Sequence, residues 1–471
     1  MIRPLALPAL ALALAGCSLA PVYERPAAPV PASWPVGDAY LLHSEATLPE
    51  ISYREVFRDA RLQALIAAAL ANNRDVRIAA ANVAAARAQV RAVRSAQFPE
   101  VGIDASADIQ AREGPDGESY ALRGGITGFE LDLFGRLANA TETERQRALA
   151  TEAGARTVRI ALVADLASAW AIYAADRDLL AIARETADNA RRAVELTRRR
   201  LEGGIAPRTD LRQAEQVLAT AEGDLAELTS AVAQDENLIR LLVGGPVDPA
   251  LLPAGLGEVF AAVATLPAGT DSAVLLRRPD VLEAEYRLRA ANADIGVARA
   301  ALFPRIALTG LAGLASDALG ALFTGGAFTA TAGADAAYTI FDAGGRRARV
   351  AVSEAQRDAA LAAYERSIQA AFREVADALA VQGTIGERLR AAQANSEAAA
   401  DAAALTEARY RGGIESFLGN LVAQRSLYAA RQRETGVMLA AVRNRIDLYR
   451  TLAADAALAT ATEAREPGGT P

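Results

Sequence analysis

Two stretches of this chain, Arg200-Leu201-Glu202-Gly203-Gly204-Ile205 and Arg409-Tyr410-Arg411-Gly412-Gly413-Ile414, interrupt long alanine-rich segments of helical pattern. Helices often end at glycine, because glycine adopts the left-handed conformation that is common at helix C-termini. A long helical segment precedes each stretch and a shorter one follows it. The pairs Gly203-Gly204 and Gly412-Gly413 are therefore predicted to be tight turns between two helices.

The segment before the first turn, residues 136–201, contains no proline. An apolar stripe follows it at helical spacing and comprises Val158, Leu162, Leu166, Trp170 and Tyr173. At ~1.5 Å per residue this helix would be on the order of 100 Å long. Since no globular core holds such a helix, it must pack lengthwise against other helices, as in a coiled coil.

Between the helical segments, residues 101–110 and 328–341 alternate between apolar and polar side chains. With 120–133 and 305–314 they make four predicted strands. Each has about the length of a tilted membrane-barrel strand, with one face for lipid and one for water. Four strands cannot close a barrel, and lipid does not tolerate open sheet edges, so three copies would pool their strands into a twelve-stranded barrel. A soluble hairpin packed on the helices is the alternative.

The chain also repeats its plan, because corresponding points recur at offsets of 205, 210 and 209 residues. These points are Phe98-Pro99 with Phe303-Pro304, Gly135-Arg136 with Gly345-Arg346, and Gly203-Gly204 with Gly412-Gly413. Such constant offsets indicate an internal duplication. A helix predicted over 60–97 opens the first repeat, and one predicted over 278–303 opens the second. The irregular segment between the repeats is expected over 243–267.

Six segments are predicted along the chain. They are a signal peptide (1–16), a lipidated proline-rich segment (17–59), a first repeat (60–243), an equatorial connector (244–277), a second repeat (278–455) and a flexible tail (456–471).

The composition argues against several classes of function. Cys17 is the only cysteine and His43 the only histidine, which excludes a disulfide framework and a Cys/His metal site and argues against a Ser-His-Asp or Cys-His triad. The net charge of -7 comes with no basic stretch for nucleic acid. Gly344-Gly345 opens a helix but lacks the Lys-Ser/Thr of a phosphate-binding loop. We expect neither an enzyme nor a cofactor, metal or nucleic-acid partner.

The N-terminus has the pattern of a bacterial signal peptide, with Arg3 before a short apolar run. Leu14-Ala15-Gly16-Cys17 resembles a lipobox, which implies cleavage before Cys17 and a diacylglycerol and an N-acyl lipid on that residue. An ordinary signal peptide is the alternative. Ser18 stands where an aspartate would retain a lipoprotein, so the resemblance implies passage to the outer membrane. Residues 21–35 contain five prolines and predict an extended strap.

The stretch Leu275-Leu276-Arg277-Arg278-Pro279-Asp280-Val281 closely resembles the TolC-like outer-membrane efflux factors, in particular the lipoprotein (NodT-type) branch that serves resistance-nodulation-division pumps. Residues 290–298 (Ala-Ala-Asn-Ala-Asp-Ile-Gly-Val-Ala), Phe303-Pro304 and the start of the strap at 21–26 also match. The resemblance implies a mainly α fold with a membrane β-barrel, in which a duplicated coiled-coil tunnel and four strands per chain assemble as a homotrimer.

The same resemblance implies a function. The chain would be the outer-membrane exit duct of a tripartite efflux system, lipid-anchored and extending into the periplasm. It would passively conduct small toxic compounds outward when a periplasmic adaptor and an inner-membrane pump open it. A type I protein-secretion duct and a non-conducting structural envelope lipoprotein are the alternatives.

The closed end of such a duct is expected at the two turns. Carried over from the family, Tyr410 and Asp210 are predicted to form a hydroxyl–carboxylate contact that holds the tips, with Arg409 or Arg411 nearby. Asp210 also follows Pro207 at a helix start, where a capping role is equally suitable. The two roles are compatible.

One departure from the family concerns the aperture. Relatives often carry acidic residues at the positions of Gly419 and Val422, and neither residue is acidic here. Glu415 stands where some relatives have arginine. A constriction at this place would be apolar, tightened by Leu418 and Val422. The pore is therefore predicted to be less cation-selective than those of its relatives.

Overall fold

The computed structural model describes residues 18–37, 39–40, 52–110, 117–266, 272–452 and 458. The predicted signal peptide, Cys17 and all of the predicted tail except Leu458 lie outside these residues. The chain divides into two compact units. The strand unit is Met1–Ala28, Ala81–Ala153 and Leu282–Ser367, and the hairpin unit is Pro29–Ala80, Gly154–Val281 and Ile368–Pro471.

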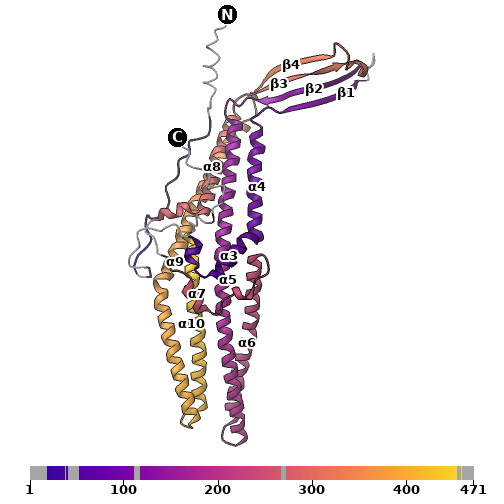
Figure 1. Ribbon diagram of the computed structural model, residues 1–471. Helices are drawn as coiled ribbons and strands as arrows, with labels where there is room; N and C mark the ends of the chain where they lie inside the picture. The colour runs from indigo at the N-terminus through magenta and orange to yellow at the C-terminus, as the bar shows by residue number, and fades with distance from the viewer. Residues whose placement is uncertain are drawn as a thin grey trace. The chain divides into compact units, whose positions relative to one another are not determined.

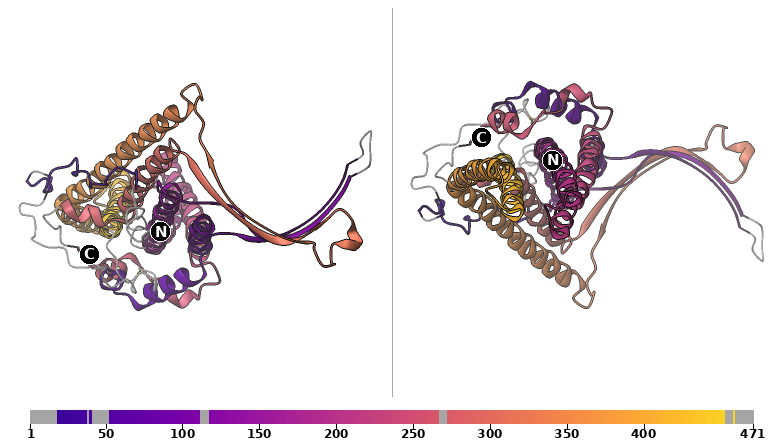
Figure 2. Two further views of the ribbon diagram at one scale, coloured as in Figure 1. Left: turned by 90° about the horizontal axis from the view of Figure 1, so that it is seen from above. Right: turned by 90° about the horizontal axis from the view of Figure 1, so that it is seen from below.

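The strand unit contains one antiparallel sheet, in which the strands lie in chain order and form a curved ribbon (Figure 2). Its strands are β1 (Val101–Gln110), β2 (Gly117–Glu130), β3 (Arg305–Ser316) and β4 (Phe328–Ala337). All four predicted strands are confirmed. The predicted end of the fourth strand was wrong, because β3 begins at Arg305, which lies opposite Ala337, so the residues after Ala337 have no partner on β3.

The strand register places the apolar residues on one face of the sheet. Ala105 lies opposite Leu122, Leu122 opposite Leu314, and Leu314 opposite Phe328. The next row is polar or small, with Asp104 opposite Arg123. On the apolar face Ile103 is 82% exposed and Phe328 70%, so no part of the described chain covers these side chains. A sheet with one uncovered apolar face fits contact with lipid.

The helices carry most of the chain (Figure 1). They are α2 (Tyr53–Val56), α3 (Ala60–Asn72), α4 (Arg74–Ser95), α5 (Arg136–Glu202), α6 (Arg208–Val243), α7 (Leu256–Ala262), α8 (Pro279–Ala300), α9 (Gly345–Arg411) and α10 (Phe417–Leu452). Short 3-10 turns are η1 (Pro249–Leu251), η2 (Ser272–Arg277) and η3 (Leu319–Ala321). The two long helices, α5 and α9, each have 67 residues and end at the predicted turns.

The single helix predicted over 60–97 was wrong, because the chain breaks at Asn73 between α3 and α4. Asn73 has an extended ψ of 139°. Its side-chain oxygen accepts from the backbone of Asp75 and caps α4, while its amide nitrogen donates to the Leu242 carbonyl at 2.9 Å. Gly244, with a φ of 79°, ends α6 at the same place. The break between α3 and α4 therefore lies where the C-terminal end of α6 contacts the N-terminal end of α4.

The segment expected to be irregular over 243–267 contains the short helix α7. The Asp178 carboxylate on α5 accepts the backbone N–H of Leu256 at 2.9 Å and so satisfies one of the free donors at the helix start. Leu256 and Val259 are buried. The hydrogen bond to α5 and the burial of Leu256 and Val259 thus stabilise α7. The glycine-rich sequence around α7 gives no local signal for a helix.

Candidate functional site

The two Gly-Gly turns have the same backbone geometry. Gly204 and Gly413 adopt left-handed φ angles of 70° and 75°. The N–H of Ile205 donates to the Arg200 carbonyl at 2.8 Å, and the equivalent Ile414 N–H donates to the Arg409 carbonyl at 2.9 Å. These bonds close a Schellman motif, which satisfies the last carbonyls of each long helix. The duplication is thus visible in the hydrogen bonds of the turns.

Above the turns, aromatic and aliphatic side chains join the α5–α6 and α9–α10 hairpins. Tyr410 (8% exposed) and Phe417 (6%) pack ring against ring at a centroid distance of 5.8 Å. The Arg200 guanidinium lies 5.0 Å from the centre of the Tyr410 ring, within cation–π distance. The remaining members of this tip cluster are Val194, Leu211 and Ala214, with Leu201, Leu218 and Leu421 packed against it.

The predicted Tyr410–Asp210 contact stays a prediction. Among the residues that the structure describes, no hydrogen bond joins the Tyr410 hydroxyl to Asp210. The contacts of Tyr410 are made by its aromatic ring, which packs on Phe417 and lies beside the Arg200 guanidinium. Asp210 lies in the first turn of α6, where a carboxylate is favoured by the helix dipole. The N-cap position itself is Pro207, which has no side-chain cap.

The predicted arginines pair within their own hairpin. The Arg409 Nε lies 3.6 Å from the Glu415 carboxylate, and Arg411 pairs with Glu407 one turn earlier on α9. Both arginine side chains are more than half exposed. Ion pairs of this kind contribute little to stability.

The start of α10 places a carboxylate beside Gly419. Ser416 caps this helix, since its hydroxyl accepts the Gly419 N–H at 3.0 Å. The Glu415 carboxylate folds back and accepts the Ser416 N–H at 3.1 Å. A Cβ on residue 419 would lie 2.5 Å from this carboxylate. A negative charge is thus present beside Gly419, but it comes from Glu415. Leu418 and Val422 are 55% and 54% exposed.

Sequence reasoning missed a second tyrosine–aspartate pair between the same hairpins. The Tyr428 hydroxyl on α10 donates to the Asp224 carboxylate on α6 at 2.7 Å. Burial, and then this hydrogen bond, raise the pKa of Tyr428, so the phenol remains a donor at neutral pH. Nearby, Arg431 pairs with Glu185 of α5 at 2.9 Å. Tyr428 and Asp224 are 204 positions apart in the sequence, and no local sequence pattern identifies either residue.

An acidic pair on α5 and α6 was also missed. Burial raises the pKa of Asp235 to about 7, and the neighbouring Asp176 carboxylate adds to this effect. Burial also raises the pKa of Asp176. One oxygen of Asp235 is buried without a hydrogen-bond partner. The two carboxyl groups are therefore expected to share a proton near neutral pH.

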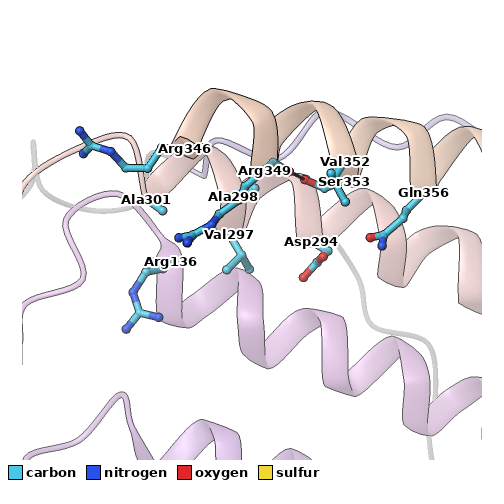
Figure 3. Close-up of a pocket in the computed structure, with 10 residues that line it drawn as sticks. All are labelled: Arg136, Asp294, Val297, Ala298, Ala301, Arg346, Arg349, Val352, Ser353 and Gln356. Carbon is cyan, nitrogen blue, oxygen red and sulfur yellow. Dashed lines mark hydrogen bonds between the residues drawn. The ribbon is translucent and has the colours of Figure 1, made fainter. Parts of the chain in front are cut away.

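The strand unit contains a cavity of about 290 Å³ between the start of α5, α8 and the start of α9 (Figure 3). Two of the arginines that line it are already paired, Arg136 with Glu130 and Arg346 with Asp342. Within the described ranges, no group of three His, Cys, Asp or Glu side chains could hold a metal ion.

Comparison with known proteins agrees with this architecture. The family model described as outer membrane efflux protein matches residues 65–245 and 272–454. The chain belongs to this family. Two relatives come from Pseudomonas putida: the antibiotic efflux pump outer membrane protein ArpC and the toluene efflux pump outer membrane protein TtgC. Each is 40% identical to this chain over 458 residues, and the match covers 95% of this chain and 94% of the relative.

Solved structures of the same family share the fold. The open state of the Neisseria gonorrhoeae MtrE outer membrane channel is 31% identical, with a TM-score of 0.83, and the match covers 93% of this chain and 98% of that one. The predicted family, the fold class and the outer-membrane location are confirmed. The protein is an outer-membrane efflux duct.

Proposed function

We propose that this duct is the exit component of a tripartite system, in which a periplasmic adaptor and an inner-membrane resistance-nodulation-division pump open a passive channel. Two features together support the proposal. The sheet has one uncovered apolar face, and the two helical hairpins end in turns of the same backbone geometry. A sheet of this kind suits a lipid boundary, whereas a structural spacer between membranes has no need of it. No side chain in this arrangement performs bond chemistry.

The functional duct is a homotrimer. The sheet has two open edges, β1 and β4, and unpaired backbone groups at such edges are not tolerated in the hydrocarbon core. Pairing β4 of one copy with β1 of the next closes the edges. Three copies give a barrel of twelve strands, wide enough to hold water.

The strap supports a lipid anchor at Cys17. Residues 18–25 lie along α8, where the Pro21 carbonyl accepts from the Asn292 side chain at 2.7 Å and Arg25 pairs with Glu285. The strap runs antiparallel to α8, because the Leu19 carbonyl accepts from Arg299 in the last turn of that helix. Leu19 is thus at the end of α8 that leads into β3. A lipid on Cys17 at this level would enter the bilayer that surrounds the strands.

The cargo class follows from the relatives. Their names refer to antibiotics and to toluene, and we propose that this chain conducts small toxic compounds of similar kinds. Deletion of the gene should lower resistance to toluene and to some members of an antibiotic panel, and the wild-type chain should restore it. If no compound is affected and the purified protein forms no trimer, the proposal fails.

A further inference from the structure

The cavity of the strand unit is lined by three arginines, and one of them differs from the other two. The Arg136 guanidinium pairs with the Glu130 carboxylate at 2.7 Å, and the Arg346 guanidinium pairs with the Asp342 carboxylate at 3.0 Å. Arg349 lies one turn after Arg346 on α9, and within the described ranges no carboxylate pairs with its guanidinium. A guanidinium of this kind is available to an anion from outside the chain.

The two ends of the cavity differ in charge (Figure 3). Arg136 and the guanidinium of Arg349 lie toward one end, and Asp294 of α8 lies toward the other. Val297 and Ala298 lie between the two ends. Because α5 and α9 both begin at this cavity, the positive ends of their dipoles add to the arginine charge. The cavity thus has a cationic end, an apolar wall and a carboxylate that repels a second negative charge.

The cavity lies on the side of α8 that faces away from the strap. The strap contacts Glu285, Asn292 and Arg299, which are spaced seven residues apart and share one side of the helix. Asp294 and Ala301 line the cavity and stand two positions after Asn292 and Arg299. At about 100° per residue, two positions lead to the opposite side of a helix. In the proposed duct the strap leads to the lipid anchor and so lies outside the helical wall, and the cavity opens to the channel.

We propose that this cavity binds small amphiphilic monoanions, such as carboxylates with an apolar chain, as they pass through the duct. The ligand carboxylate pairs with the Arg349 guanidinium, whose fork of donors matches it, and the chain lies along Val297 and Ala298. The cavity volume of about 290 Å³ is at the small end of ligand pockets. The inference rests on the proposed function as a duct and adds one class of cargo to it.

Binding of octanoate to the purified trimer tests this site. In nanodiscs of neutral lipid, isothermal titration of octanoate into wild type should show a saturable component. Arg349→Gln should weaken this binding about tenfold, since a charge-assisted hydrogen bond to the carboxylate is lost. Octanedioate has the same chain length with a second carboxylate. It should bind to wild type several-fold more weakly than octanoate, because its second charge meets Asp294.

Arg347→Gln is the matched control. Arg347 is exposed, carries the same charge as Arg349 and is not among the residues that line the cavity. Its replacement should change the affinity for octanoate by less than about twofold, because exposed charges at a distance are screened. No saturable binding to wild type, an equal loss of affinity in the two variants, or tighter binding of octanedioate than of octanoate would overturn the site.

The phosphate of a membrane lipid is the other anion that a guanidinium could take. Native mass spectrometry of trimers purified from outer membranes measures the phosphatidylglycerol that they retain. Wild type and Arg349→Gln should retain equal amounts, and retention that depends on Arg349 would overturn the assignment to cargo.

The titration and the rescue of resistance can fail independently. If octanoate does not bind while the wild-type chain restores resistance, the site is refuted and the duct stands. If octanoate binding depends on Arg349 while the chain restores no resistance, the duct function is refuted and the anion site stands.

Discussion

At the scale of single residues, Asp235 has an environment unlike that of an ordinary surface carboxylate. The pKa of its carboxyl is raised from 3.8 to about 7, so between these pH values the folded chain binds more protons than the unfolded one. Stability therefore falls as the pH rises through this window, and the loss is complete above about pH 7. Burial also raises the pKa of Asp176, which therefore lowers stability in the same way as the pH rises.

Replacing Asp235 by asparagine removes the contribution of Asp235 to this pH dependence and leaves that of Asp176. At pH 8 we expect amide exchange along α6 to be roughly three- to tenfold slower in Asp235→Asn than in wild type, and at pH 5 the two should be similar. Hydrogen-exchange mass spectrometry at both pH values measures the difference. Asp248→Asn, an exposed carboxylate after α6, is the control and should leave exchange along α6 unchanged. Equal exchange of wild type and Asp235→Asn at pH 8 would contradict the shared proton.

At the scale of elements, a buried carboxylate is one of the groups that hold the strap to α8. The Glu285 side chain is 2% exposed and accepts hydrogen bonds from Arg25, Arg289 and the Tyr23 hydroxyl. Burial alone would raise the pKa of Glu285, but the hydrogen bonds from the two arginines lower it. The carboxylate is therefore ionised, and its ion pair with Arg25 joins the strap to the helix in addition to the hydrogen bonds at Pro21 and Leu19.

We expect Glu285→Gln to release the strap, because the neutral amide leaves Arg25 and Arg289 close together without a negative charge between them. The cost should be about 1–3 kcal/mol, less than for a fully buried pair, since Arg25 is 45% exposed. Chymotrypsin should then cleave after Tyr23 several-fold faster. Glu283→Gln, which breaks only a pair on the outside of α8, provides the comparison, and equal cleavage of both variants would refute the role of Glu285.

The helices also show which structural features can be predicted from the sequence, namely those that depend on local signals. Proline-free helical periodicity and glycine pairs predict α5 and α9 and their ends, because these signals are local. Asn73 gives no such signal, since the residues around it fit a helix, and the break depends on a carbonyl 169 positions away. The same reason hides Tyr428 and Asp224. Each lies in an ordinary helix, and only the packing of the two hairpins brings them together.

At the scale of the whole molecule, the two faces of the sheet should respond differently to charge. Ala332 lies on the apolar face opposite Gly310, and its neighbour Thr331 lies on the other face opposite Leu311. An arginine on the lipid side of a barrel costs about 2–4 kcal/mol near the middle of the bilayer, whereas one on the water side costs little. Ala332→Arg should therefore abolish the trimer band on a semi-native gel of outer membranes.

Thr331→Arg is the matched control for that experiment and should retain the trimer. Loss of the trimer in both variants, or in neither, would mean that the apolar face does not meet lipid.

Ion selectivity belongs to the assembled pore. Glu415 supplies the negative charge beside Gly419, and its carboxylate lies 3.6 Å from the Arg409 Nε. This pair adds no net charge to the aperture, and the side chains of Leu418 and Val422 are uncharged. Asp104 and Asp108 lie on the polar face of β1, but charges in a wide barrel act only over the Debye length of about 8 Å. We therefore expect only a weak cation preference, measured as the reversal potential across a salt gradient in planar bilayers. Glu415→Gln should shift that potential slightly toward anions by freeing Arg409, and a wild-type value near that of an ideal cation channel would refute this account of the aperture.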